Sequence, residues 1–275
     1  MANGSFAGTY GVELLVEQVP QIDKAKLLVA LRKREKVDSL DENSDLLAFA
    51  YTEYEIQYQN AAIPAQIFVA IAEQSPDAER TRPSVEQTWD WPDAKASVER
   101  CRATVLVTDL MSSGLEYKTR LRLLHNAVLS VLEQINCIGI HWQPSQRIVD
   151  PQAYIKSKRN EEDEIFPAIN VRLFRVENGQ PGETLMDTLG LAALGIPDIQ
   201  CHFFTLDSQE VARVLFNTGY YLFGQGDVIQ DGHTVQGPDE PQKWKCQHED
   251  ALVAPERVVL DLDAGAFAAG NRDRS

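Results

Sequence analysis

The stretch ATVLVTDL, residues 103–110, decides the fold class of this chain. Its apolar run is typical of a strand that is buried in the middle of a β-sheet. From about residue 115 to residue 134, apolar residues recur at steps of three and four, which predicts a long amphipathic helix directly after the strand. The helix face expected to lie on the sheet consists of Leu121, Leu124, Val128, Val131 and Ile135.

The sequence on the N-terminal side predicts a strand, a helix and a set of antiparallel strands. Residues 10–16 are consistent with a strand, and Asp23 is expected to cap the helix that follows. Between residues 46 and 72, aromatic and β-branched residues predict two or three strands, namely LLAFAYT, YEIQYQ and AQIFVAIA. Residues 73–84, EQSPDAERTRPS, are polar and contain two prolines, so we expect a surface loop that separates two parts of the chain.

The sequence on the C-terminal side predicts further strands and a second main helix. CIGIHWQ, AINVRLFRV and IQCHFFTL have the composition of strands, and Pro151 suits the first position of a short helix. Asp207 or Ser208 is expected to cap an amphipathic helix that ends at Gly224. Residues 184–198, TLMDTLGLAALGIPD, are mostly small and are not assigned to a strand. The expected buried face of the second helix consists of Val211, Val214, Leu215, Thr218 and Leu222.

This order of elements predicts an α+β fold with a largely antiparallel sheet packed by two main amphipathic helices. Because both halves contain strand–helix–strand runs, two ferredoxin-like halves are an alternative arrangement. We expect an N-terminal strand–helix–strand lobe at residues 1–80 and a main α+β region at residues 85–265 that forms one compact unit. Residues 266–275 are expected to be a frayed tail.

The composition excludes some classes of partner. With 26 Lys and Arg against 41 Asp and Glu, the formal net charge is −15 and the sequence pI is about 4.8. Such a surface repels nucleic acid and anionic membranes and attracts basic proteins, although solubility alone also explains it. The N-terminus lacks the pattern of a signal peptide, and no apolar run reaches the roughly 20 residues that span a bilayer, so we expect a cytoplasmic protein.

The sequence predicts neither a metal site nor a cofactor. Its four cysteines lie far apart, as reduced thiols of a cytosolic protein do. Cys201 and His202 are neighbours on a strand and point to opposite faces, whereas Cys246 and His248 share a face but supply only half of a zinc site. Nucleophile elbows, zinc-protease motifs and phosphate-binding loops are missing from the sequence, so we assign no catalytic residue.

Two segments are candidates for binding a protein partner. Trp89 and Trp91 alternate in WDWP and would project to one side of an extended segment, as a partner-binding patch or as a plug of the core. The acidic run Glu161, Glu162, Asp163 and Glu164 is either a solvated loop or an electrostatic landing site for a basic partner.

The glycine-rich segment GQGDVIQDGHTVQG, residues 224–237, resembles a ligand-binding loop in composition. Phosphate-binding glycines precede a helix, whereas these glycines follow one, so Gly224 and Gly226 are expected to end the helix. Residues 227–230 then predict a strand, and Asp231-Gly232 a hairpin turn towards the strand KWKCQHE, with VVLDLD as the last strand. An alternative is a ligand site formed by Asp231, His233 and His248.

A family resemblance is carried by IPAQIFVAIAE, by WDWPDAKASV leading into ATVLVTDL, by TLGLAALGIPDIQ and by DGHTVQG, in this order. These motifs resemble an uncharacterised bacterial family catalogued as domain of unknown function 4261, over residues 61–263. The resemblance implies a bacterial, cytoplasmic setting and implies no reaction, cofactor or catalytic residue.

For function, we expect a non-catalytic protein-binding module, namely an immunity protein or adaptor for a bacterial toxin or secreted effector. An acidic chain without a catalytic signature suits neutralisation of a basic partner. The alternative is an enzyme of unknown reaction whose site lies near the C-terminal hairpin.

Overall fold

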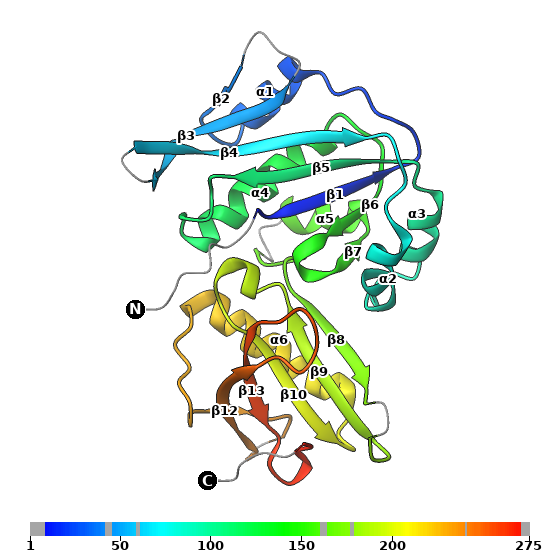
Figure 1. Ribbon diagram of the computed structural model, residues 1–275, viewed down its shortest axis with the longest axis vertical. Coiled ribbons are helices and arrows are strands. Elements are labelled where there is room, and N and C mark those ends of the chain that lie inside the picture. The colour runs from blue at the N-terminus through cyan, green and yellow to red at the C-terminus, as the bar shows by residue number, and fades with distance from the viewer. Residues whose placement is uncertain are drawn as a thin grey trace. The chain divides into compact units, whose positions relative to one another are not determined.

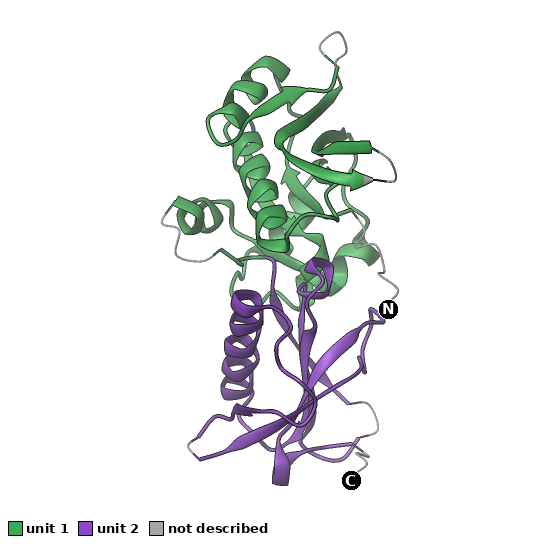
Figure 2. Cartoon of the chain, turned by 90° about the vertical axis from the view of Figure 1, so that its left-hand side faces the viewer, with its two compact units in different colours: residues 1–167 green, residues 168–275 purple. Residues whose placement is uncertain are grey.

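The computed structural model of the chain describes residues 9–41, 46–58, 61–159, 164–176, 179–239 and 241–270. The chain forms two compact units, residues 1–167 and 168–275, each built on its own sheet (Figures 1 and 2). Both sheets are largely antiparallel and carry helices, which confirms the α+β class. Within the described ranges, no helix has the length and hydropathy needed to cross a membrane.

Unit 1 is a seven-stranded sheet in the order β2-β3-β4-β5-β1-β6-β7, with helices on its faces. Its strands are β1 (Gly11–Val16), β2 (Val37–Ser39), β3 (Leu47–Tyr58), β4 (Ala61–Ala72), β5 (Ala103–Leu110), β6 (Cys137–Trp142) and β7 (Arg147–Val149). Its α-helices are α1 (Lys24–Arg32), α2 (Ala78–Glu86), α3 (Ala94–Arg100), α4 (Tyr117–Leu132) and α5 (Pro151–Arg159).

The stretch that decides the fold is strand β5, and it lies inside the sheet as predicted. β5 pairs antiparallel with β4 on one side and with β1 on the other, and β1 pairs antiparallel with β6. The order β4-β5-β1-β6, with α1 following β1 and α4 following β5, is the ferredoxin-like arrangement. Unit 1 is therefore a ferredoxin-like core extended by β2, β3 and β7.

Helix α4 is buried on more sides than its periodicity predicts. The expected face is buried from Leu121 to Val131, and Ile135 is half-buried beyond the end of the helix. Leu123 and Ala127 are buried as well, because the Tyr51 hydroxyl donates to the Leu123 carbonyl and α1 packs against α4. When several elements cover a helix, apolar residues occur on more than one of its faces, and the sequence pattern no longer shows which face contacts the sheet.

The structure has two strands between residues 46 and 72, which is one of the two numbers that the sequence predicts. The pairing of β3 with β4 shifts register between Tyr51 and Glu55. The loop expected at residues 73–84 is wrong in part, because its residues from Ala78 onwards belong to α2, which the Asp77 carboxylate caps by accepting the N–H groups of Glu79 and Arg80. Since β4 and β5 pair across this segment, the chain divides at residue 167 and not near residue 80.

Unit 2 is a six-stranded sheet in the order β11-β12-β13-β10-β9-β8, packed by one long helix. Its elements are β8 (Asn170–Arg175), β9 (Glu183–Leu189), β10 (Asp198–Phe204), α6 (Ser208–Gln225), β11 (Thr234–Gln236), β12 (Lys243–Asp250) and β13 (Val258–Asp263). Because β10 and β13 are parallel neighbours with no strand between them, unit 2 is not a ferredoxin-like half.

Helix α6 confirms the second amphipathic prediction. Asp207 caps it with its carboxylate, its predicted face is buried, and it ends at Gln225, one residue beyond the expected position. Gly226 follows with a φ of 82°. A Cβ at Gly219 would lie 2.6 Å from Cδ1 of Ile169, so this glycine lets the helix approach the sheet closely.

Four details of unit 2 differ from the sequence-based predictions. Most of β9 lies in the small-residue stretch for which no strand is predicted, and residues 227–230 form no strand. The hairpin that was placed at Asp231-Gly232 joins β11 and β12 further along the chain. Residues 266–270 are not frayed, because Ala268 pairs with Phe203 and the Ala269 N–H donates to the His202 carbonyl, while residues 271–275 lie outside the described ranges.

Candidate interaction site

The two tryptophans of the WDWP stretch have different environments. Trp91 is half-buried and packs on the core of unit 1, whereas Trp89 keeps 50% of its surface exposed. Asp90, between the two tryptophans, lies in a bend, so residues 89–91 do not form the extended run that would place both indoles on one side. The core cluster that receives Trp91 contains Leu15, Ala94, Cys101 and Ile148.

Residues 88–93, which we call the Trp89 loop, are fixed on both sides of Trp89. The Thr88 hydroxyl donates to the Ser84 carbonyl at 2.7 Å and accepts the N–H of Ile148 at 3.1 Å. After Trp89, Arg147 Nη2 donates to Asp90 Oδ2 at 2.5 Å. Because its neighbours are tied to α2 and β7, the backbone at Trp89 is held in place while the indole is half exposed.

An open depression of about 310 Å³ has Trp91 in its wall. Asp93 and Asp150 contribute carboxylates to it, and Arg100 contributes a guanidinium that is paired with Glu17 at 2.8 Å. Cys137 also lines the depression, but burial raises the pKa of its thiol to about 12, so it is no thiolate nucleophile at neutral pH. The depression offers carboxylates and an aromatic wall, which suit a cationic or amphipathic partner group.

Only one residue of the acidic run at residues 161–164, the other candidate for binding a partner, is described by the structure. Glu161, Glu162 and Asp163 lie outside the described residues. Glu164 is described, and its backbone carbonyl accepts hydrogen bonds from His125 Nε2 and Lys158 Nζ, each at 3.2 Å. The described end of the run therefore closes a loop against α4 and α5.

A Ser–His–Glu hydrogen-bond chain in unit 1 was not found by sequence reasoning. Ser84 Oγ lies 2.8 Å from His141 Nε2, and His141 Nδ1 lies 3.0 Å from Glu13 Oε2. Glu13 and His141 face each other on the paired strands β1 and β6, and α2 brings Ser84 above them. Burial acts to raise the pKa of Glu13, but the hydrogen bond to His141 and the charge of Arg80 outweigh it and hold the pKa below its usual value.

Ser84, His141 and Glu13 are connected in the same order as the nucleophile, the base and the orienting carboxylate of a catalytic triad. Ser84 is only 1% exposed, however, and it lies within α2, so a substrate carbonyl cannot approach its hydroxyl. These hydrogen bonds satisfy the buried side chains of Ser84 and His141 and fasten α2 to the sheet through the partly buried Glu13. Only the register of β1 with β6 brings its members together, and no local sequence signal marks them.

Two of the three residues of the alternative ligand site in unit 2, Asp231 and His248, are in contact. Asp231 Oδ1 lies 2.8 Å from His248 Nδ1 and also accepts the His248 backbone N–H at 2.8 Å, while Asp227 Oδ1 lies 3.3 Å from His248 Nε2. His233 does not join them, because its ring accepts the N–H of Gln230. Gly232, between Asp231 and His233, has a φ of 85°, a left-handed conformation that glycine adopts readily.

The two aspartates alter the acid–base behaviour of His248. Desolvation acts to lower the pKa of His248, but the hydrogen bond to Asp231 and the charge of Asp227 outweigh it and raise the pKa. The backbone and ring contacts of His248 lower the pKa of Asp231. Among the described residues, no group of three or more His, Cys, Asp and Glu side chains is arranged to hold a metal ion.

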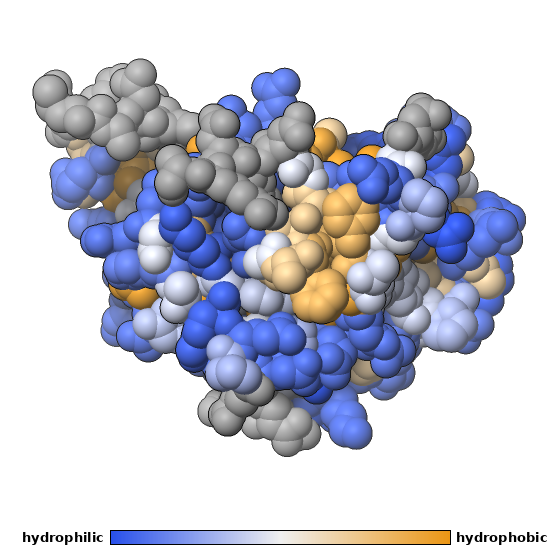
Figure 3. All heavy atoms as spheres, turned by 90° about the horizontal axis from the view of Figure 1, so that it is seen from below, coloured by the Kyte–Doolittle hydropathy of each residue, from blue (hydrophilic) through white to orange (hydrophobic). Residues whose placement is uncertain are grey.

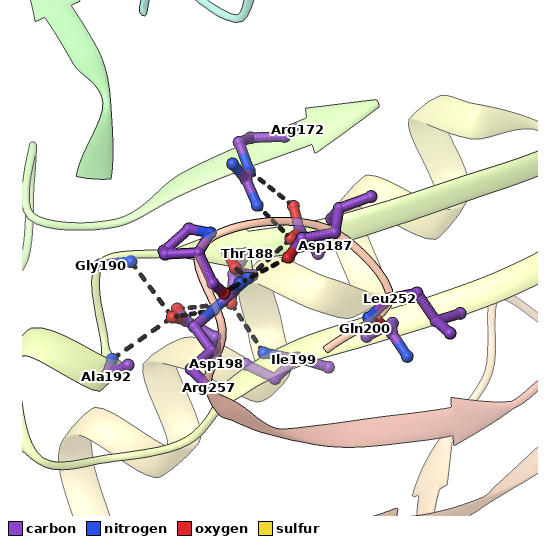
Figure 4. Close-up of polar contacts among 12 residues, drawn as sticks. Arg172, Asp187, Thr188, Gly190, Ala192, Asp198, Ile199, Gln200, Leu252 and Arg257 are labelled. Atoms are coloured by element: carbon purple, nitrogen blue, oxygen red, sulfur yellow. Dashed lines mark hydrogen bonds and ion pairs between the residues drawn. The ribbon is translucent and has the colours of Figure 1, made fainter. Parts of the chain in front are cut away.

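A buried ion-pair network lies on the face of the unit 2 sheet opposite α6 (Figure 4). Arg172 donates to both carboxylate oxygens of Asp187, at 2.9 and 2.5 Å. Arg257 bridges two carboxylates, with Nη2 at 2.7 Å from Asp187 and Nε at 3.0 Å from Asp198. Ile199, the next residue after Asp198, faces Gly219 of α6, so the network side chains point the other way.

Asp198 is fully buried in this network, as Asp187 is. Complete burial raises its pKa, and Arg257 and the N–H of Leu191 counteract that effect. The Thr188 hydroxyl donates to its carboxylate at 3.1 Å. A single aspartate within each of the apolar stretches LMDTL and IPDIQ was the signal that could have revealed Asp187 and Asp198.

The comparisons with known proteins bear on this part of the chain. The family model described as Domain of unknown function (DUF4261) matches residues 187–263. Residues 187–263 are therefore similar to the DUF4261 family. The match covers the expected motifs TLGLAALGIPDIQ and DGHTVQG, whereas the two motifs quoted from residues 63–110 lie outside it. No curated protein and no solved structure matches the chain.

The DUF4261 match lies within unit 2 and contains most of the buried network. Asp187, Asp198 and Arg257 belong to it, and Arg172 on β8 lies before its first residue. The Trp89 loop belongs to unit 1 and is outside the matched segment.

Proposed function

We propose that this chain is a non-catalytic, cytoplasmic protein-binding module of bacteria, an immunity protein or adaptor for a toxin or secreted effector. The observation that carries the proposal is the fixed presentation of Trp89 at the surface of unit 1. Trp91 contributes by anchoring the loop in the core and by forming the wall of the adjoining depression.

The geometry of the Trp89 loop favours tight binding of a protein. Tryptophan is enriched among the few residues that carry most of the free energy of an interface. Ordering a loop on binding costs free energy, and a loop that is already tied down on both sides avoids most of that cost. Thr88, Asp90 and Trp91 provide these ties, so the indole of Trp89 is ready to enter a partner's pocket.

The charge of the chain favours a basic partner. Asp93 and Asp150 lie beside Trp91 in the depression, and the chain as a whole carries a net charge of −15. Most of the face drawn in Figure 3 is hydrophilic, with apolar side chains gathered in a limited area. Complementary charge speeds the encounter with a basic toxin or effector and selects against acidic proteins. Glu161, Glu162, Asp163 and Glu164 belong to the same proposal as an additional source of negative charge.

A second candidate function is an enzyme whose site includes Asp231 and His248, with His233 nearby in sequence. The observation that favours it is the 2.8 Å contact between Asp231 and His248 Nδ1, which orients an imidazole in the manner of a general base. Under this alternative, His248→Ala would abolish turnover and leave capture of the protein partner intact.

The test of the binding proposal is affinity capture with the tagged chain from its source cells, followed by mass spectrometry and titration of the purified partner. Trp89→Ala should weaken the measured affinity by about 30-fold or more, as loss of an interface hot spot of about 2 kcal/mol does. Tyr221→Ala is the matched control, because Tyr221 on α6 is 53% exposed and lies outside the Trp89 loop.

Two outcomes would contradict the proposal. One is capture of no protein above an untagged control. The other is a partner whose affinity is the same for Trp89→Ala and for Tyr221→Ala, since the exposed indole would then carry none of the binding free energy.

A further inference from the structure

The connection between β12 and β13, residues 251–257, is a closed loop that lies over the unit 2 sheet, and we call it the strap. The Ala251 N–H donates to the Arg257 carbonyl at 2.9 Å and closes its base. Inside the loop, Arg257 Nη1 donates to the carbonyls of Val253 and Pro255 at 3.2 and 2.8 Å. The strap is therefore filled by the side chain of its own last residue.

The strap is also tied to the sheet beneath it. Arg257 bridges Asp187 and Asp198, as described above, and its Nη2 donates to the Thr188 carbonyl at 3.0 Å. At the other end, the Leu252 N–H donates to Gln200 Oε1 at 2.8 Å (Figure 4). With both ends fastened to buried side chains, the strap has a fixed shape before any partner arrives.

The outer side of the strap is apolar. Leu252 is 56% exposed, Val258 at its end is 55% exposed, and Ala254 and Pro255 are exposed between them. Single exposed apolar residues are ordinary, but a run of them on a rigid loop is typical of an interaction surface. The polar contacts that hold the strap are made by its backbone and by Arg257, and the half-exposed side chain of Leu252 makes none of them.

The charges beside the strap indicate the kind of surface that would cover it. Asp250 precedes the strap and Glu256 lies within it, and both are exposed. A second copy of this chain would bring another net charge of −15 against these carboxylates. A partner with Lys or Arg around an apolar recess complements both the carboxylates and Leu252.

We infer that the strap is a second docking loop, and that it binds a protein partner through an apolar recess ringed by basic residues. The inference goes beyond the Trp89 surface and rests on the proposed protein-binding role of the chain. Leu252 enters the recess, and Asp250 and Glu256 pair with its basic rim. Arg257 holds the loop in the binding conformation through Asp187 and Asp198.

The test uses a display library of random twelve-residue peptides, selected on the full-length chain. Peptides that combine apolar residues with Lys or Arg should be enriched, and Leu252→Asp should weaken their binding at least about tenfold, which corresponds to about 1.4 kcal/mol. Leu252→Ser is the second variant, in case the aspartate disturbs the strap. Val29→Asp is the matched control, because Val29 on α1 of unit 1 is 58% exposed.

The outcomes separate this inference from the Trp89 proposal. Peptides that lose binding to Trp89→Ala but bind both Leu252 variants as they bind the parent support the Trp89 loop and overturn the strap. Absence of enrichment over an unrelated acidic protein also overturns it. A dimer in sedimentation that both Leu252 variants dissolve would assign the strap to a second copy and overturn the basic-partner inference.

Discussion

Trp89 and Trp91 stand two positions apart, yet one reaches solvent and the other fills the core. Alternation along an extended strand would have placed them on one side, and the bend at Asp90 interrupts that alternation. His248 and His233 also differ in their surroundings, because the His248 ring lies between Asp231 and Asp227 whereas the His233 ring accepts a backbone N–H. At the scale of the residue, the backbone path decides which of two similar side chains has a special environment.

The raised pKa of His248 predicts how stability depends on pH. A histidine whose pKa is higher in the folded state contributes stability that is fully present below its unfolded value of 6.5 and is lost as pH rises through the folded value. His248→Gln should therefore lower the melting temperature most below about pH 6.5, and the difference from the parent should shrink towards pH 8.5. Thermal melts over this range measure it.

The control for this prediction is His233→Gln, since the His233 ring contacts a backbone N–H and no carboxylate in the structure. Its difference from the parent should not follow the same pH profile. A difference for His248→Gln that grows with rising pH would show that the contacts with Asp231 and Asp227 do not favour the charged imidazole.

At the scale of the element, the sequence predicts where most helices begin and which face of each main helix is buried. It does not predict that a helix is covered by other elements on several sides. Asp23, Asp207 and Pro151 mark helix starts as predicted, because capping depends on a few neighbouring residues. Helix α2 is not predicted, since the polar composition and the two prolines of residues 73–84 indicate a loop, whereas Asp77 caps a helix there. Helix α4 was placed correctly, but its burial on several sides arises from elements far along the chain.

A charge in the buried face of α4 should unfold unit 1. Val128 is fully buried, so Val128→Asp places a carboxylate in an apolar seam at a cost of several kcal/mol, against a total stability of about 5 to 15 kcal/mol. Circular dichroism and thermal melts should show loss of the cooperative transition. Val29→Asp, on the exposed side of α1, should melt close to the parent, and equal melts for the two variants would mean that the buried face is misplaced.

At the scale of the whole molecule, the chain divides into two units, each with its own sheet (Figure 2). The expected lobe at residues 1–80 and main region at residues 85–265 do not coincide with these units, because the pairing of β4 with β5 joins residues on both sides of the expected seam. A polar, proline-containing segment marks a surface position and does not by itself mark a domain boundary.

Because each unit has its own sheet, we expect loss of the buried ion-pair network to destabilise unit 2 and to leave unit 1 unchanged. Arg257→Ala leaves Asp187 and Asp198 without one cationic partner, and removal of one member of a buried ion pair costs about 3–5 kcal/mol. Hydrogen exchange should accelerate in β9, β10 and β13 and stay unchanged in β1, β5 and α4. Arg175→Ala, at the exposed end of β8, is the control, and equal exchange in both arginine variants would mean that the network does not support unit 2.

The sequence by itself determined the α+β class, most strands, the two main helices and their buried faces, because these features depend on periodicity and caps within one segment. Only the tertiary structure decided the division into two units, the outward position of Trp89, the strap and both buried polar clusters. Arg257 and Asp187 are 70 residues apart in sequence, and Glu13 and His141 are 128 apart. Such pairs meet only through strand pairing between distant segments, and that pairing depends on how the whole chain buries its apolar surface.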